Sequence, residues 1–316
     1  MNLYGKEKNI MNEIEFLHTP VLLQEVLQGL KINTNGTYVD ATVGGAGHTI
    51  EIAKKLKNGK IFAFDRDPDA VLVAKKKLEN YNAEVYNLNF REIKKVLDKV
   101  KVDGVLMDLG VSSFQLDNEK RGFSYLKEGP LDMRMSKSGK TAKSLIATAT
   151  EKELIYILKN YGEEGFCKKI AKKIIERRKE KPIETTLELS KIINSVFPSK
   201  FKRDKNPSKK SFQAIRIAIN DEINSLKEGI SSVFSLLKPG ARLLIISFHS
   251  LEDRIVKEFY KEKSSSCICP KDLPVCVCKK TKEARIITKK PIVPSKTEIE
   301  KNKRAASAKL RILEKI

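Results

Sequence analysis

A short glycine-rich segment and one aspartate are the residues whose spacing points most clearly to chemistry. Three glycines directly follow a predicted strand in Asp40-Ala-Thr-Val-Gly-Gly-Ala-Gly-His48. Glycines at such a turn let a ligand come close to the backbone, although a tight turn without a ligand is the alternative. Asp65 ends the next predicted strand, where a carboxylate accepts the hydroxyl hydrogens of a ribose. Together these features indicate a nucleoside-containing cofactor.

The glycine spacing discriminates among the common nucleotide cofactors. A dinucleotide site requires G-x-G-x-x-G, but Ile50 occupies the third glycine position when the count starts at Gly45. A nicotinamide oxidoreductase is therefore disfavoured, and no Walker lysine follows the glycines. S-adenosylmethionine, which has a ribose and an adenine but no phosphate, is the remaining common choice.

The elements that must position these residues alternate apolar runs with helical patterns. This rhythm predicts an α/β fold with a parallel sheet and crossover helices. The predicted strands are Thr37–Thr42, Lys60–Asp65, Ala83–Asn87, Asp103–Asp108 and Arg242–Phe248. Between Phe114 and Ser211 the pattern is helical, with capping-box spacing at Thr150 and Thr185.

We therefore predict an α/β domain that is divided by a helical insertion. Residues 1–115 form its first part, 116–211 form a helical unit for substrate or RNA recognition, and 212–316 form its second part. Few apolar residues lie between Lys261 and Ile286, so we expect a basic, cysteine-containing C-terminal arm that extends over the surface.

The net charge of +22 favours a polyanionic partner, nucleic acid before membrane, although a lysine-rich solvated surface is the alternative. Basic residues concentrate in residues 168–181, 200–210 and 279–290. We expect these three segments to contact the phosphates of such a partner. No apolar stretch is long enough to span a membrane, and Met1–Ile10 lacks the apolar core of a signal peptide, so a cytosolic location is expected.

Four of the five cysteines lie close together, in the pattern C-x-C, six residues, C-x-C. They are Cys267, Cys269, Cys276 and Cys278. Four thiolates bind zinc tetrahedrally, but the usual knuckle is C-x2-C, and reduced thiols are the alternative. We assign no metal to the site. Cys167 is interpreted as a packing residue.

Several longer motifs occur between residues 18 and 254. They are His18-Thr-Pro-Val-Leu-Leu, Asp65-Arg-Asp67, Asp108-Leu-Gly-Val-Ser-Ser113, Gln115-Leu-Asp117, Arg121-Gly-Phe-Ser124, Gly129-Pro-Leu-Asp-Met-Arg-Met135, Tyr161-Gly-Glu-Glu164, Phe212-Gln-Ala-Ile-Arg-Ile217 and Ser247-Phe-His-Ser-Leu-Glu-Asp-Arg254. In these motifs the chain resembles the bacterial 16S rRNA cytosine-N4-methyltransferase family, RsmH or MraW. The resemblance implies a class I, Rossmann-like S-adenosylmethionine methyltransferase fold and a small-ribosomal-subunit substrate. It does not fix the oligomeric state, and a dimer is one option.

The resemblance also implies a cofactor site. Ala46, Gly47 and His48 would meet the methionine part of the cofactor, Asp65 would hold the ribose, Phe90 would flank the adenine, and Asp108 and Gln115 would close the pocket. For Phe90, an ordinary core aromatic is the alternative.

Methylation of a cytosine amino group requires a hydrogen-bond acceptor, because the nitrogen lone pair is delocalised into the ring. Asp108 is our first candidate, although it would also fit a purely cofactor-holding role; Asp132 and His249 are second candidates. For His249, a loop-stabilising role is the alternative. Methyl transfer itself needs no metal.

Two other functions stay open at this point. A non-catalytic cofactor-binding ribosome-assembly factor is disfavoured by the intact motifs. A DNA amino methyltransferase is disfavoured because Asp108-Leu-Gly-Val replaces the usual Pro-Pro-aromatic sequence.

Overall fold

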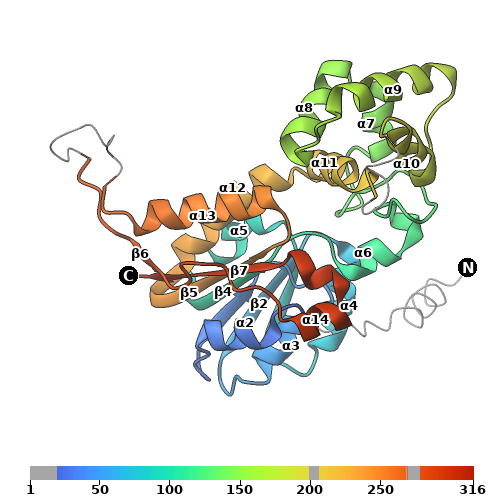
Figure 1. The fold of residues 1–316 in the computed structure, drawn as a ribbon. Helices are drawn as coiled ribbons and strands as arrows, with labels where there is room; N and C mark the ends of the chain where they lie inside the picture. The colour runs from blue at the N-terminus through green and yellow to red at the C-terminus, as the bar shows by residue number, and fades with distance from the viewer. Residues whose placement is uncertain (1–19, 199–205, 268, 270–277) are drawn as a thin grey trace, which may run out of the picture.

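A computed structural model describes residues 20–198, 206–267, 269 and 278–316. Its centre is a seven-stranded sheet with the order β3-β2-β1-β4-β5-β7-β6 (Figure 1). The strands are β1 (Thr37–Asp40), β2 (Lys60–Asp65), β3 (Ala83–Asn87), β4 (Val102–Asp108), β5 (Leu237–Ser247), β6 (Ala284–Ile286) and β7 (Lys309–Lys315). Strands β1 to β5 pair in parallel, whereas β7 runs antiparallel to both β5 and β6.

Helices cover both faces of this sheet. They are α2 (Leu23–Leu30), α3 (Gly47–Ala53), α4 (Pro68–Lys77), α5 (Lys94–Leu97), α12 (Glu222–Leu236) and α13 (Ser250–Ser264). Neighbouring strand residues face opposite layers: Val105 belongs to the cluster under α12 and α13, and Leu106 to the cluster that includes α2 and α3 (Figure 1). Because both faces are buried, the strands are apolar along their length.

The order in which the chain adds strands to the sheet reverses at β1: β2 and β3 lie on one side of it, and β4 and β5 on the other. Strand β1 pairs with β2 on one side and with β4 on the other. Ligands of doubly wound sheets bind at this kind of switch point, beyond the carboxyl ends of the strands. The loops after β1 and β4 are therefore the expected walls of a site.

A helical unit lies beyond this carboxyl edge (Figure 1). It contains α7 (Ala142–Thr148), α8 (Glu151–Gly162), α9 (Cys167–Glu180), α10 (Thr186–Ser195) and α11 (Ser208–Asn220). The predicted capping boxes at Thr150 and Thr185 are confirmed at the starts of α8 and α10. The unit has its own hydrophobic cluster, and α11 contributes Phe212 and Ile215 to it. Helix α11 thus crosses residue 211, and the domain boundary at that residue stays a prediction.

The prediction of a surface arm after Lys261 is wrong for the end of the chain. Strand β7 lies between β5 and β6, and its Leu310, Ile312 and Leu313 are buried. Its charged residues concealed this role, but the structure pairs them: Arg311 Nε lies 2.6 Å from Asp253 Oδ1, and Glu314 accepts a hydrogen bond from Arg242. A strand can carry charges into a sheet when partners neutralise them.

Short helical segments and loops complete the fold. They are η1 (Phe90–Glu92), α6 (Ser113–Asp117), η2 (Glu119–Arg121), α14 (Lys296–Lys301) and η4 (Lys303–Ser307). Residues 200–205 of the predicted RNA-binding segment and Cys276 lie outside the described residues. Among the described residues, no helix is long and apolar enough to cross a membrane.

Candidate active site

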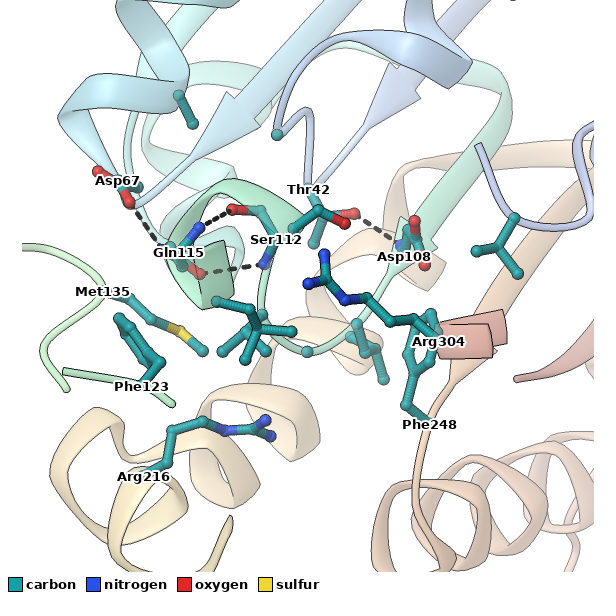
Figure 2. A pocket seen from close by; sticks show the side chains of 18 of the residues that line it. Thr42, Asp67, Asp108, Ser112, Gln115, Phe123, Met135, Arg216, Phe248 and Arg304 are labelled. Atoms are coloured by element: carbon teal, nitrogen blue, oxygen red, sulfur yellow. Dashed lines mark hydrogen bonds between the residues drawn. The ribbon is translucent and has the colours of Figure 1, made fainter. Parts of the chain in front are cut away.

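A cavity of about 910 Å³ lies at the carboxyl ends of the parallel strands (Figure 2). Its walls come from the loops after β1, β2, β4 and β5, from α11 of the helical unit and from η4 near the C-terminus. Of the predicted site residues, Gly47, His48, Asp65, Phe90, Asp108, Gln115 and His249 line it. Ala46 and Asp132 do not line it.

The loop after β1 holds its shape through a buried carboxylate. Asp40 accepts hydrogen bonds from the Thr49 hydroxyl at 2.6 Å and from the Thr42 amide at 3.0 Å. Gly44 has φ +48°, a left-handed conformation that suits glycine, and Ala46 adopts the same region at φ +63°. Ala46 is fully buried beneath the turn, which explains why only its neighbours reach the cavity.

Asp65, at the end of β2, connects two loops. Its Oδ2 accepts a hydrogen bond from Gly44 N at 2.9 Å, and its Oδ1 accepts one from Asp67 N at 2.8 Å. Burial raises the pKa of this carboxyl to about 6, against the lowering effect of both amides. Each carboxylate oxygen has a second lone pair, so the side chain, which lines the cavity, keeps acceptor capacity for the hydroxyl groups of a ligand.

A buried hydrogen-bond network around Asp67 supports the loop after β2. It includes Arg121, to which the sequence analysis assigned no role. Asp67 Oδ2 accepts a hydrogen bond from Gln115 Nε2 at 2.7 Å (Figure 2). The same oxygen accepts one from Arg121 at 2.8 Å. Gln115 also closes the capping box of α6 with Ser112. Both functional groups of the Gln115 amide are therefore used in fixing the wall, and Arg121 neutralises the buried Asp67.

Phe90 lies where the cavity meets the hydrophobic core. It lines the cavity and also packs against the main hydrophobic cluster. Helix α12 passes so close to the ring that a Cβ on Gly229 would lie 2.3 Å from Phe90 Cδ2. The ring is thus held in place while one part of it remains available to a ligand.

Asp108 and His48 form the chemically distinctive part of the cavity. Asp108 Oδ2 lies 3.7 Å from His48 Nδ1, and its buried Oδ1 has no hydrogen-bond partner among the described residues. His48 Nε2 lies 3.0 Å from the Val21 carbonyl oxygen, so Nε2 carries the hydrogen and Nδ1 is an acceptor.

Burial has opposite effects on the pKa values of this pair. Desolvation lowers the pKa of His48 to about 4. It raises the pKa of Asp108 well above its usual value, and the charges of Asp40 and Glu252 raise it further. The imidazole is therefore neutral at pH 7, and Asp108 Oδ1 is a buried acceptor that a ligand N–H or O–H would satisfy.

The two second candidates occupy different environments. Asp132 pairs with Arg134 through two hydrogen bonds, of 2.9 and 2.7 Å, so its carboxylate is occupied outside the cavity. His249 lines the cavity, but its Nδ1 also accepts from Glu252 N at 3.4 Å as the N-cap of α13. The structure thus brings His249 near Asp108 and leaves Asp132 apart.

Basic side chains surround the cavity. Arg216 of α11 and Arg304 of η4 are two of them (Figure 2). Arg216 pairs with Glu222 through two hydrogen bonds of 2.8 Å, and Arg304 pairs with Asp117. Lys209, Lys127 and Lys303 also line the cavity. A polyanionic substrate would meet positive charge from three separate elements.

An α/β sheet of this strand order, with aspartates at the ends of β2 and β4 that both line the cavity, is the arrangement of a class I methyltransferase. The model of the MraW methylase family matches residues 15–316, and the chain belongs to that family. The family confirms the fold class, the enzyme class and S-adenosylmethionine as the cofactor expected from the sequence.

Curated relatives match over nearly the whole chain. The Ribosomal RNA small subunit methyltransferase H of Carboxydothermus hydrogenoformans is 50% identical over 309 residues, which is 96% of this chain and 99% of the relative. Its counterpart in Clostridioides difficile is 49% identical over 311 residues, with 96% and 100% covered. A solved methyltransferase from Streptococcus mutans in complex with SAH aligns with a TM-score of 0.45 and 13% identity, covering 95% of this chain and 100% of that one.

Proposed function

We propose that the chain transfers a methyl group from S-adenosylmethionine to N4 of one cytidine in small-subunit ribosomal RNA. The relatives named above support the RNA substrate. The observation that carries the choice of an amino group is the buried, unpartnered Oδ1 of Asp108 in the cavity. An acceptor in this position suits a target that presents an N–H.

The residues divide into binding and chemical roles. We assign Gly47 and Asp65 to the cofactor, with Asp65 accepting the ribose hydroxyls and Phe90 flanking the base. Gln115 and Arg121 hold the wall through Asp67. When bound, S-adenosylmethionine supplies an electrophilic methyl group on its sulfonium.

Asp108 is assigned to the amino group of the target. In its carboxylate form, Oδ1 accepts a hydrogen bond from the cytosine amino group, which aligns the nitrogen and increases electron density on it. The same oxygen takes the proton that the nitrogen loses after methylation. Burial raises the pKa of Asp108 and thereby makes its carboxylate a stronger base than that of an exposed aspartate.

The helical unit and η4 are assigned to the RNA. A paired cytosine has its amino group engaged, so the target must be unpaired or flipped into the cavity. Lys209, Arg216 and Arg304 are placed to contact phosphates beside such a nucleotide. The RNA substrate of the proposed reaction points to the cytoplasm.

The decisive experiment supplies the protein, methyl-labelled cofactor and small ribosomal subunits from cells that lack the enzyme. We expect label at N4 of a single cytidine in the rRNA. Cofactor binding without transfer would instead indicate the non-catalytic assembly factor, and label in DNA would indicate the DNA methyltransferase. Either result overturns the proposal.

A further inference from the structure

The cysteine cluster after α13 is the chemical feature that the proposed methyl transfer does not use. None of its described cysteines lines the cavity. The ends of the segment, at α13 and β6, lie on the side of the sheet away from α7 to α10 (Figure 1). A function of these cysteines must therefore be separate from methyl transfer.

The described sulfur atoms lie close together although they come from two different segments of the chain. Cys267 and Cys269 leave α13, and Cys278 approaches β6, yet their Sγ atoms all lie within 4.8 Å of one another. The Sγ atoms of Cys267 and Cys278 are 3.9 Å apart. Two thiolates bound tetrahedrally to one zinc, each at about 2.3 Å, are about 3.8 Å apart, whereas bonded sulfurs of a disulfide are about 2.05 Å apart.

The backbone near the cluster also suits a metal. The amide of Cys269 donates a hydrogen bond to Cys267 Sγ at 3.4 Å, and an N–H directed at sulfur stabilises a thiolate ligand. Lys279, directly after Cys278, has φ +48°, so the chain turns sharply there. These features bring sulfur atoms from both sides toward one point.

The ends of the segment are fixed next to each other. Glu283 N donates to the Lys263 carbonyl oxygen at 3.0 Å, and the Lys263 ammonium pairs with the Glu283 carboxylate at 2.9 Å. Beyond this closure, Cys267, Cys269 and Cys278 are all partly or fully exposed. A bound metal would cross-link the chain segment that leaves α13 to the segment that returns to β6.

We propose that Cys267, Cys269 and Cys278 bind one structural zinc ion as thiolates. Soft thiolate ligands select zinc over hard cations such as Mg²⁺. Because none of these cysteines lines the cavity, the ion serves structure rather than methyl transfer. The ion fixes the segment between α13 and β6, and thereby the edge of the sheet at β6. Cys276 lies outside the described residues.

The first test measures metal content of the full-length protein, purified without chelator from zinc-supplemented cells. We expect about one zinc per chain by mass spectrometry of the elements. The zinc content of the double variant Cys267→Ser/Cys278→Ser should be about tenfold lower than that of the wild type. The control Cys167→Ser, in the helical unit, should keep the wild-type zinc content. Zinc that is absent from the wild type or unchanged in the double variant overturns the proposal, as does iron with labile sulfide in its place.

A second test reads the structure of the segment itself. Replacement of zinc by Co²⁺ should produce the near-ultraviolet charge-transfer absorption of thiolate ligands in the wild type and not in the double variant. Chelation should accelerate trypsin cleavage after Lys279 or Lys280 by about tenfold while cofactor affinity stays unchanged. Cleavage that chelation does not change, or a Cys267–Cys278 disulfide in protein kept under reducing conditions, contradicts a zinc clamp. Neither test depends on methyl transfer, so the outcome is independent of the proposed function.

Discussion

Asp108 and His48 face each other at the cavity wall, with Oδ2 of the aspartate 3.7 Å from Nδ1 of the histidine. The histidine holds its hydrogen on Nε2, toward the Val21 carbonyl oxygen, and thus presents a lone pair to the aspartate. Desolvation lowers the pKa of His48 to about 4 and raises that of Asp108. Burial therefore disfavours the charged form of each of the two groups.

His48 should make the protein sensitive to acid. Between its unfolded pKa of 6.5 and its folded value of about 4, the unfolded chain binds more protons, so stability is complete above pH 6.5 and is lost as the pH falls toward 4. His48→Gln retains a donor for Val21 but does not titrate. The drop in unfolding free energy from pH 7 to 4.5, measured by urea denaturation, should be about 2 to 3 kcal/mol smaller in this variant. Equal drops in both proteins would show that His48 is charged when folded.

Asp65 should set the pH dependence of cofactor binding. Its carboxylate form accepts the ribose hydroxyls, and its pKa in the folded protein is about 6, so affinity should be constant above that pH and fall as the pH decreases below it. Asp65→Ala should weaken binding by about 10- to 100-fold and remove this dependence, through loss of charge-assisted hydrogen bonds. Calorimetric titration at several pH values measures both effects. Unchanged affinity in Asp65→Ala would place the ribose elsewhere.

Asp108→Asn distinguishes proton acceptance from cofactor holding. The amide preserves the shape of the side chain but cannot take a proton, so kcat should fall by about 10² to 10⁴ with little change in cofactor affinity. Asp132→Asn is the matched control and should leave kcat within about threefold, because Asp132 pairs with Arg134 outside the cavity. Loss of cofactor affinity with an unchanged kcat for Asp108→Asn would assign this residue to cofactor binding only.

The Arg121–Asp67 pair should contribute far more to stability than the Arg304–Asp117 pair. Both partners of the first are buried, so Arg121→Met leaves an uncompensated charge and should cost about 3 to 5 kcal/mol. The second pair is exposed, so Arg304→Met should cost less than about 1 kcal/mol. Chemical denaturation of the two variants measures both losses of unfolding free energy. Similar losses would mean that burial does not make the Arg121–Asp67 pair more important than the exposed pair.

Lys209 and Lys210 should contribute to RNA affinity through phosphate contacts. Both lie in the first turn of α11, and Lys209 lines the cavity. Lys209→Gln/Lys210→Gln should weaken binding to small-subunit particles and leave cofactor affinity unchanged. The slope of the logarithm of the binding constant against the logarithm of the salt concentration should become less steep by about one to two. Lys55→Gln/Lys57→Gln, near the amino end of β2, is the control. If cofactor affinity falls together with RNA affinity, these lysines serve folding instead.

Local patterns in the sequence were sufficient for several features of this protein. Capping-box spacing predicted the starts of α8 and α10, and apolar runs predicted the five parallel strands. The glycine loop and Asp65 pointed to a nucleoside site. Such features can be recognised in a sequence because a turn and the end of a strand are set by residues that are close together in the chain. The net charge of +22 indicated a polyanion but not where it binds.

Contacts between distant residues were decided only by the tertiary structure. Arg121 meets Asp67 across 54 positions, and Arg304 meets Asp117 across 187. Strand β7 enters the sheet because Asp253 and Arg242 neutralise its charges, which its own sequence could not reveal. The chemical state of Asp108 likewise depends on burial and on His48, 60 residues away in the sequence. Burial and charge pairing are properties of the packed molecule, and for that reason the sequence identified the site while only the fold defined its electrostatics.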